Sequence, residues 1–190
     1  EGHFTRTSNR HDYALAPFSK TALDSLKDAG LDVIGVGKIP DIFVDQGITR
    51  KIKTVSNEDG MNKTIELASD NFNGLAFINL VDFDAVYGHR RNAAGYGKAI
   101  EEFDVQLGEL INELKNDDLL MVTADHGNDP TYRGTDHTRE QVPLIIYSKQ
   151  FNEMKVLNDS NSFGIIGSTI CDNFNVKYNG IGSSILELLK

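Results

Sequence analysis

The chain has 190 residues, of which 39 % are hydrophobic, and it carries a formal net charge of −9. This length and composition suit one domain with a buried core, and the longest apolar stretches fall far short of the roughly 20 residues of a membrane-spanning helix. The acidic charge argues against a nucleic-acid or anionic-membrane partner, because both would be repelled.

Helical and extended hydrophobic patterns alternate along the chain. Residues 1–15 are polar and without a clear period, which is typical of a connecting arm. Helical spacing predicts helices over 19–29, 57–69, 93–115, 162–173 and 183–189. Apolar, β-branched runs predict strands over 31–37, 74–83, 118–125 and 143–148. Several of these strands are continuously apolar, so we expect an α/β fold with a mainly parallel β-sheet flanked by helices on both faces.

The only cysteine, Cys171, lies in an apolar stretch that is predicted to be helical. We expect a buried and unreactive thiol, which is compatible with a reducing compartment, and we expect the protein in the cytoplasm. A small phosphorylated molecule is a possible partner despite the acidic charge, because bound divalent cations can reverse the sign of the field inside one pocket.

Two predicted strands lead into acidic and imidazole side chains, where an ordinary turn needs a single capping residue. Five such residues stand out: Asp84, His89, Asp125, His126 and His137. The first two follow the strand over 74–83, and the other three lie at or after the end of the strand over 118–125. If these strands are neighbours in a parallel sheet, the five residues lie at the same edge, where ligands of such sheets collect.

Carboxylate oxygen and imidazole nitrogen together suit zinc, manganese or another borderline divalent ion. Five ligands are too many for one tetrahedral ion and one or two short for two ions, so we expect part of a two-metal site. The alternative is that each residue is a cap, a turn former or a loop charge. For one Asp-His pair that alternative is preferred, and the presence of two clusters reverses the preference.

Charged residues beside the five candidates have simpler interpretations. We expect Asp82 and Asp136 to orient a histidine or face solvent, and Asp129 to start a turn. The neighbouring arginines, which can each bind phosphate but more simply neutralise aspartates, are Arg90, Arg91, Arg133 and Arg139. Lys38 follows the strand over 31–37, where it can meet a substrate. No order or spacing nominates a nucleophile.

Two segments resemble the metal-binding segments of the phosphopentomutase family, within the alkaline-phosphatase-like metalloenzyme superfamily. They read "NLVDFDAVYGHRR" (79–91) and "TADHGNDPTYRGTDHTREQVPL" (123–144), and "FTRTSNRHDYAL" and "VIGVGKIPDIF" extend the similarity over nearly the whole chain. The resemblance implies two manganese ions, one held by Asp84, His89 and His137, and the other held in part by Asp125 and His126. It also implies a substrate-binding role for Lys38.

The resemblance further implies a nucleophilic threonine and another aspartate ligand in an N-terminal segment, neither of which can be placed in this chain. Residues 1–18 would connect from a cap domain, and residues 19–190 would be the C-terminal part of the metal-binding catalytic core. We therefore expect the isolated 190 residues to be inactive.

The implied reaction moves phosphate between C1 and C5 of ribose or deoxyribose through a phosphothreonine, with a small phosphosugar as the partner. Paired cations suit this chemistry because they place positive charge against the phosphoryl oxygens. Three alternatives are a cofactor-independent phosphoglycerate mutase or phosphatase of the same superfamily, an inactive metal-binding fragment, and a non-enzymatic α/β binding module.

Overall fold

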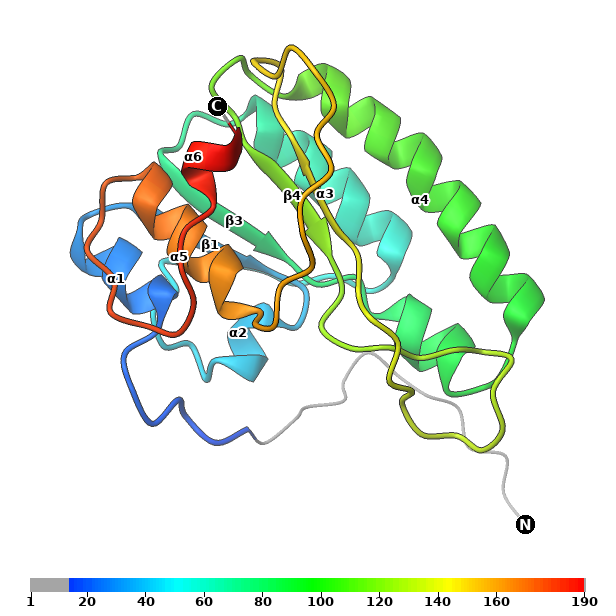
Figure 1. The fold of residues 1–190 in the computed structure, drawn as a ribbon. Coiled ribbons are helices and arrows are strands. Elements are labelled where there is room, and N and C mark those ends of the chain that lie inside the picture. Colours follow the sequence, from blue (N-terminus) through cyan, green and yellow to red (C-terminus); the bar gives the residue numbers. More distant parts are fainter. Residues whose placement is uncertain (1–13, 190) are drawn as a thin grey trace. The chain divides into compact units, whose positions relative to one another are not determined.

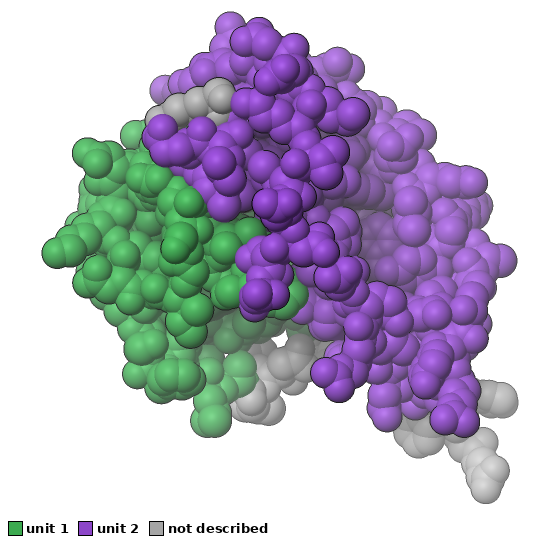
Figure 2. All heavy atoms as spheres, in the orientation of Figure 1, with its two compact units in different colours: residues 1–55, 72–79, 162–184 green, residues 56–71, 80–161, 185–190 purple. Residues whose placement is uncertain are grey.

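The computed structural model describes residues 14–189, which form two compact units (Figure 2). Unit 1 contains residues 14–55, 72–79 and 162–184, and unit 2 contains residues 56–71, 80–161 and 185–189. Most of the segment over 1–18, which we expect to be a connection from a cap domain, lies outside the described residues. Within the described range, no helix is both long enough and apolar enough to cross a membrane.

Unit 1 is built on a three-stranded parallel sheet with the order β2-β1-β3 (Figure 1). Its strands are β1 (Asp32–Val36), β2 (Arg50–Ile52) and β3 (Gly74–Ile78). Adjacent residues of a strand point to opposite faces, and Val33 and Ile34 are both fully buried, so both faces of β1 are covered. The expected α/β fold with a parallel sheet flanked by helices is therefore confirmed.

The helices of unit 1 are α1 (Ala22–Asp28), α2 (Ile39–Ile42) and α5 (Gly164–Asn173). A capping box starts α1, because the Thr21 hydroxyl accepts the Asp24 N–H and the Asp24 carboxylate accepts the Thr21 N–H. Helices α1 and α5 and strand β1 share one core, which consists of Leu23, Leu26, Val33, Ile39, Ile48 and Cys171. Cys171 is 1 % exposed, so the expected burial of the thiol is confirmed.

Unit 2 contains a pair of long helices, a π-helical turn and a two-stranded sheet (Figure 1). Its elements are α3 (Asn57–Ser69), η1 (Phe83–Gly88), α4 (Ala93–Glu113), β4 (Leu120–Thr123), β5 (Leu144–Tyr147) and α6 (Leu186–Leu189). Helix α4 packs against α3 and η1, and the Phe83 ring lies 5.7 Å from the Tyr96 ring and 6.0 Å from the Phe103 ring. Strands β4 and β5 pair antiparallel, whereas the sequence predicts mainly parallel pairing.

Several sequence-predicted boundaries differ from the structure. The strand expected to reach Phe83 ends at Ile78, and the chain then forms η1 instead of continuing in the sheet. Strand β2 escapes prediction because Arg50 and Lys51 are charged and exposed, as suits the edge of a sheet. The short helix α2 also escapes prediction, since four residues beginning Ile-Pro show no helical period.

Candidate metal centre

Three of the five candidate ligands meet in unit 2. The Nε2 atom of His89 lies 3.3 Å from Oδ2 of Asp84, and Nε2 of His137 lies 3.2 Å from Oδ1 of the same carboxylate. One ligand atom from each of the three residues lies within 4.8 Å of the others. The side chains are 32 to 48 % exposed, so a small ion can reach them.

The π-helical turn η1 explains why Asp84 and His89 face one another. In an α-helix, residues five apart lie about 140° apart around the axis, and their side chains diverge. Here the His89 N–H donates to the Asp84 carbonyl at 3.0 Å, which is the i→i+5 bond of a π-turn. The wider turn brings both side chains to one side. Asp84 therefore lies in this turn and not at the tip of β3, as the sequence predicts.

A backbone hydrogen bond sets the tautomer of His89. Its Nδ1 lies 2.5 Å from the Thr135 carbonyl oxygen, which can only accept, so Nδ1 carries a proton. In the neutral ring, Nε2 then presents a lone pair to the Asp84 carboxylate. A carboxylate oxygen and an imidazole nitrogen that face each other in this way, 3.3 Å apart, suit a cation between them.

The donor set fits a divalent metal ion. Ligand atoms about 2.1 Å from one tetrahedral ion lie about 3.4 Å apart. The two oxygen–nitrogen separations are close to this value but involve different oxygens of Asp84, and one ligand atom from each residue lies within 4.8 Å of the others. One carboxylate and two imidazoles also leave a coordination position open, as catalytic sites do. Asp84, His89 and His137 could therefore hold one ion, which would supply positive charge to a phosphoryl oxygen.

The other two candidates form a separate pair beside this cluster. Asp125 Oδ1 lies 3.7 Å from Nε2 of His126, and Nδ1 of His126 lies 3.2 Å from the Gly127 carbonyl oxygen. The His126 and His137 rings stack with their centroids 3.8 Å apart. The strand expected over 118–125 ends at Thr123, so Asp125 lies in the following loop, where its side chain is 72 % exposed.

The loop between β4 and β5 folds back on itself and carries His137 to the cluster. The Thr138 N–H donates to the Gly127 carbonyl at 3.0 Å, and the Asp129 N–H donates to the Thr138 hydroxyl at 2.6 Å. Asp129 starts a turn, as the sequence predicts, because its carboxylate accepts the N–H and the hydroxyl of Thr131. These bonds from Thr131 lower the pKa of the Asp129 carboxyl.

Asn128 joins the site although the sequence does not single it out. It is 8 % exposed, and its Nδ2 donates to Oδ1 of Asp84 at 2.6 Å. Its Oδ1 accepts a hydrogen bond from Arg91 at 2.7 Å. The remaining hydrogen bonds of Arg91 go to backbone carbonyl groups and not to carboxylates, and its charge also helps to lower the pKa of the Asp129 carboxyl.

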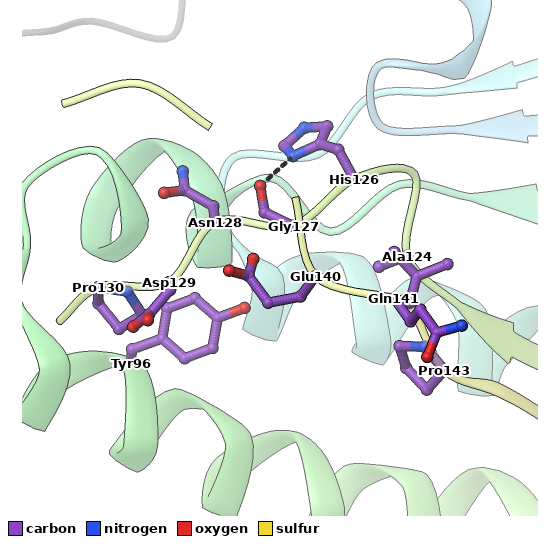
Figure 3. A pocket seen from close by; sticks show the side chains of 11 residues that line it. Tyr96, Ala124, His126, Gly127, Asn128, Asp129, Pro130, Glu140, Gln141 and Pro143 are labelled. Atoms are coloured by element: carbon purple, nitrogen blue, oxygen red, sulfur yellow. Dashed lines mark hydrogen bonds between the residues drawn. The ribbon is translucent and has the colours of Figure 1, made fainter. Parts of the chain in front are cut away.

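A cavity of about 250 Å³ lies beside the second pair (Figure 3). Its walls include Tyr96 from α4, His126 and Asn128 from one side of the loop, and Glu140 from the other. Burial raises the pKa of the Tyr96 hydroxyl, and the negative charge of Asp84 raises it further. The Tyr96 hydroxyl therefore keeps its proton around neutral pH and can donate into the cavity.

The remaining candidates occupy simpler positions. The Asp82 carboxylate accepts the Asn57 N–H at 2.7 Å, so it satisfies one free N–H group in the first turn of α3, whose N-cap is Ser56. The Asp136 carbonyl accepts a bond from Arg91, and the Asp136 side chain is exposed. Lys38 belongs to unit 1, where it follows β1 and lies 3.5 Å from Asp41. The exposed arginines in this part of unit 2 are Arg90, Arg133 and Arg139.

Comparison with known proteins gives a family match and a structural match. The sequence model of the Metalloenzyme superfamily matches residues 1–178. A crystal structure of Leishmania mexicana phosphoglycerate mutase at low cobalt concentration resembles this chain with 17 % sequence identity and a TM-score of 0.64. The match covers 89 % of this chain and 39 % of that one, so the chain spans about two fifths of the length of the mutase. At this identity the likeness shows the fold alone.

Proposed function

The chain belongs to the metalloenzyme superfamily, and we propose that it is the metal-binding part of a phosphopentomutase. The proposed enzyme interconverts the 1-phosphate and 5-phosphate of ribose or deoxyribose in the cytoplasm. A phosphothreonine gives its phosphoryl group to the free hydroxyl of the monophosphate. The resulting bisphosphate returns its other phosphoryl group to the threonine. The threonine is not assigned to any residue of this chain.

The observation that carries this proposal is the convergence of Asp84, His89 and His137 on one small volume. Phosphoryl transfer needs positive charge against the phosphoryl oxygens, and a cation held by these three ligands supplies it. We propose manganese as the metal, with Asp125 and His126 contributing to a second ion. The Tyr-Gly-His-Arg-Arg and Gly-Thr-Asp-His-Thr-Arg-Glu phrases around the ligands support the pentomutase assignment within the superfamily.

The substrate is proposed to be a small phosphosugar, with Lys38 as one of its contacts. An ammonium group directly after a parallel strand suits a phosphate or a sugar hydroxyl. Changing Lys38 to Met should raise KM for the phosphosugar about tenfold or more, since a hydrogen bond to a charged group contributes about 1.5–3 kcal/mol. An unchanged KM would show that Lys38 does not contact the substrate, and it would not bear on the proposed metal ligands.

One competing function is that of a phosphoglycerate mutase, since a protein of that name shares this fold. The two functions separate in one experiment with the manganese-loaded full-length enzyme. Ribose 1-phosphate and 3-phosphoglycerate are supplied in parallel, and the phosphate position in each product is followed by ³¹P NMR. We expect turnover of the pentose phosphate alone. Turnover of the glycerate alone would overturn the pentomutase assignment in favour of the competing function.

A further inference from the structure

We infer that Asn128 and Arg91 act together as positioning residues for the carboxylate of Asp84. The inference rests on the proposed function only in treating Asp84 as a metal ligand. Asn128 donates a hydrogen bond to the Asp84 carboxylate, and Arg91 donates one to Asn128. Together they fix the direction in which the oxygen atoms of Asp84 point.

The Asn128 amide has a defined orientation because its two neighbours differ chemically. The Arg91 guanidinium can only donate hydrogen bonds, so the acceptor Oδ1 of Asn128 faces it at 2.7 Å. The donor Nδ2 must then point the other way, and it donates to Oδ1 of Asp84 at 2.6 Å. Arginine thus selects which end of the amide the carboxylate meets.

Close packing holds this amide in place. Asn128 is 8 % exposed, and its side chain lies directly against the backbone of Gly88. A Cβ atom added at Gly88 would lie 2.5 Å from Nδ2 and 2.6 Å from Cγ of Asn128. Only glycine leaves room for the amide at this position, so the end of η1 and Asn128 are matched in shape.

Arg91 ties this arrangement to the loop that carries His137. Its guanidinium donates to the carbonyl oxygens of residues on both sides of the loop and at the end of η1: Gly134 at 2.5 Å, Asp136 at 2.6 Å, Asp129 at 2.9 Å and Gly88 at 3.1 Å. Arg91 itself has a φ of +52°, a left-handed conformation that non-glycine residues seldom adopt. The unfavourable backbone conformation of Arg91 thus occurs together with a side chain that makes several hydrogen bonds.

These contacts fix how Asp84 meets its two histidines. With Oδ1 held by Asn128, the carboxylate presents Oδ1 to His137 and Oδ2 to His89 at nearly equal separations of 3.2 and 3.3 Å. Without the amide, the carboxylate is free to rotate about its terminal bond and lose this match. Partners that orient metal ligands typically change metal affinity by about 10–100-fold when they are removed.

The test compares manganese affinity in Asn128 variants with that of a matched asparagine variant. Asn128→Leu keeps the size of the side chain and removes both hydrogen bonds, and Asn128→Ala avoids any clash of the new side chain. Asn62→Leu removes the acceptor that Gln106 uses at 2.9 Å on the surface of α3 and α4. We expect both Asn128 variants to bind Mn²⁺ about 10–100-fold more weakly by calorimetric titration, and Asn62→Leu to bind it as the wild type does. Wild-type affinity in the Asn128 variants would overturn the inference.

The arginine has its own matched control. Lys149 also donates to backbone carbonyls of unit 2, those of Asn112 and Leu114, and it lies outside the chain of contacts to Asp84. We expect Arg91→Met and Lys149→Met both to lower the urea midpoint of unfolding, and only Arg91→Met to weaken Mn²⁺ binding. Equal manganese affinity in the two variants would mean that Arg91 acts on stability alone, contrary to the inference.

A metal-free measurement separates this inference from the proposed function. In crystals of metal-free Asn128→Ala, we expect the Asp84 carboxylate to rotate away from at least one histidine Nε2. An Asp84 carboxylate that stays in place would overturn the positioning role. If the wild-type protein shows no saturable Mn²⁺ site, the proposed function fails, and the position of Asp84 in these crystals still decides the inference.

Discussion

The imidazole rings of His126 and His137 stack with centroids 3.8 Å apart and an interplanar angle of 26°. His137 also faces the carboxylate of Asp84, so one side chain touches both groups of candidate ligands. The two groups are therefore in direct contact through an aromatic pair. We therefore expect a substitution of His137 to disturb both groups of candidate ligands, and a substitution of the exposed Asp125 to disturb fewer of them.

Loss of a central ligand should remove bound metal. We expect Asp84→Ala and His137→Ala in the full-length enzyme each to reduce the manganese content markedly, because each leaves two ligands where three converge. Metal content is measured by inductively coupled plasma mass spectrometry after gel filtration. Asp117→Ala, at an exposed site of unit 2, serves as the control and should retain the metal. Wild-type metal content in both ligand variants would favour a binding module without a metal centre.

The contact between Asp82 and the first turn of α3 should contribute measurably to stability. The Asp82 carboxylate accepts the Asn57 N–H, and the Asp82 N–H donates to the Asn57 side chain at 2.9 Å. Replacing Asp82 by Ala should lower the free energy of unfolding by about 1.5–3 kcal/mol, the usual range for a hydrogen bond to a charged group. Urea unfolding followed by circular dichroism measures the change. Asp104→Ala on the exposed surface of α4 is expected to leave the urea midpoint nearly unchanged.

Asp24 should make the stability of unit 1 depend on pH. Burial raises the pKa of the Asp24 carboxyl, but hydrogen bonds from Gln46 and Thr21 and the charge of Lys20 outweigh it, and the pKa lies below its usual range. A depressed pKa means that the stabilisation is present above the unfolded-state value of about 3.9 and is lost as pH falls through the folded-state value. The difference in urea midpoint between wild type and Asp24→Asn should thus be larger at pH 7 than at pH 2.5. An equal difference at both pH values would contradict this.

Cys171 should react only after unfolding. Its side chain is 1 % exposed within the core of unit 1, and burial raises the pKa of the thiol. Both effects lower the concentration of accessible thiolate, which is the reactive form. We expect slow labelling by a thiol reagent at pH 7.5 without denaturant and rapid labelling in 6 M urea. Equally fast labelling under both conditions would show that the α5 region opens readily.

The convergence of Asp84, His89 and His137 could be predicted from sequence because the composition of these segments is abnormal for loops. Aspartate and histidine recur after two strands more often than turns require, and His89 and His137 do lie close together, with ring centroids 4.8 Å apart. The sequence places Asp84 wrongly at a strand tip, since the apolar run over 74–83 hides the end of β3 at Ile78. A π-turn has no residue pattern of its own that would correct this.

The supporting residues were not predictable in the same way. Asparagine after Gly127 is typical of a turn, and only its burial reveals another role. Arg91 lies 37 positions before Asn128, so their contact depends on how the loop folds back. Arginine beside aspartates suggests charge pairing, whereas here it bonds to carbonyl groups that any residue could supply. Since every residue has a backbone carbonyl, the amino-acid sequence does not reveal which residues accept these hydrogen bonds.

The turn between Asp84 and His89 has a consequence for protein engineering. A designer who grafts an aspartate and a histidine five positions apart onto an ordinary α-helix will find them aimed at different sides of the scaffold. Shortening the gap to four would suit that scaffold, but in this protein it would delete the widened turn closed by the His89 N–H and the Asp84 carbonyl. The pair is transferable only with its own backbone from Phe83 to His89.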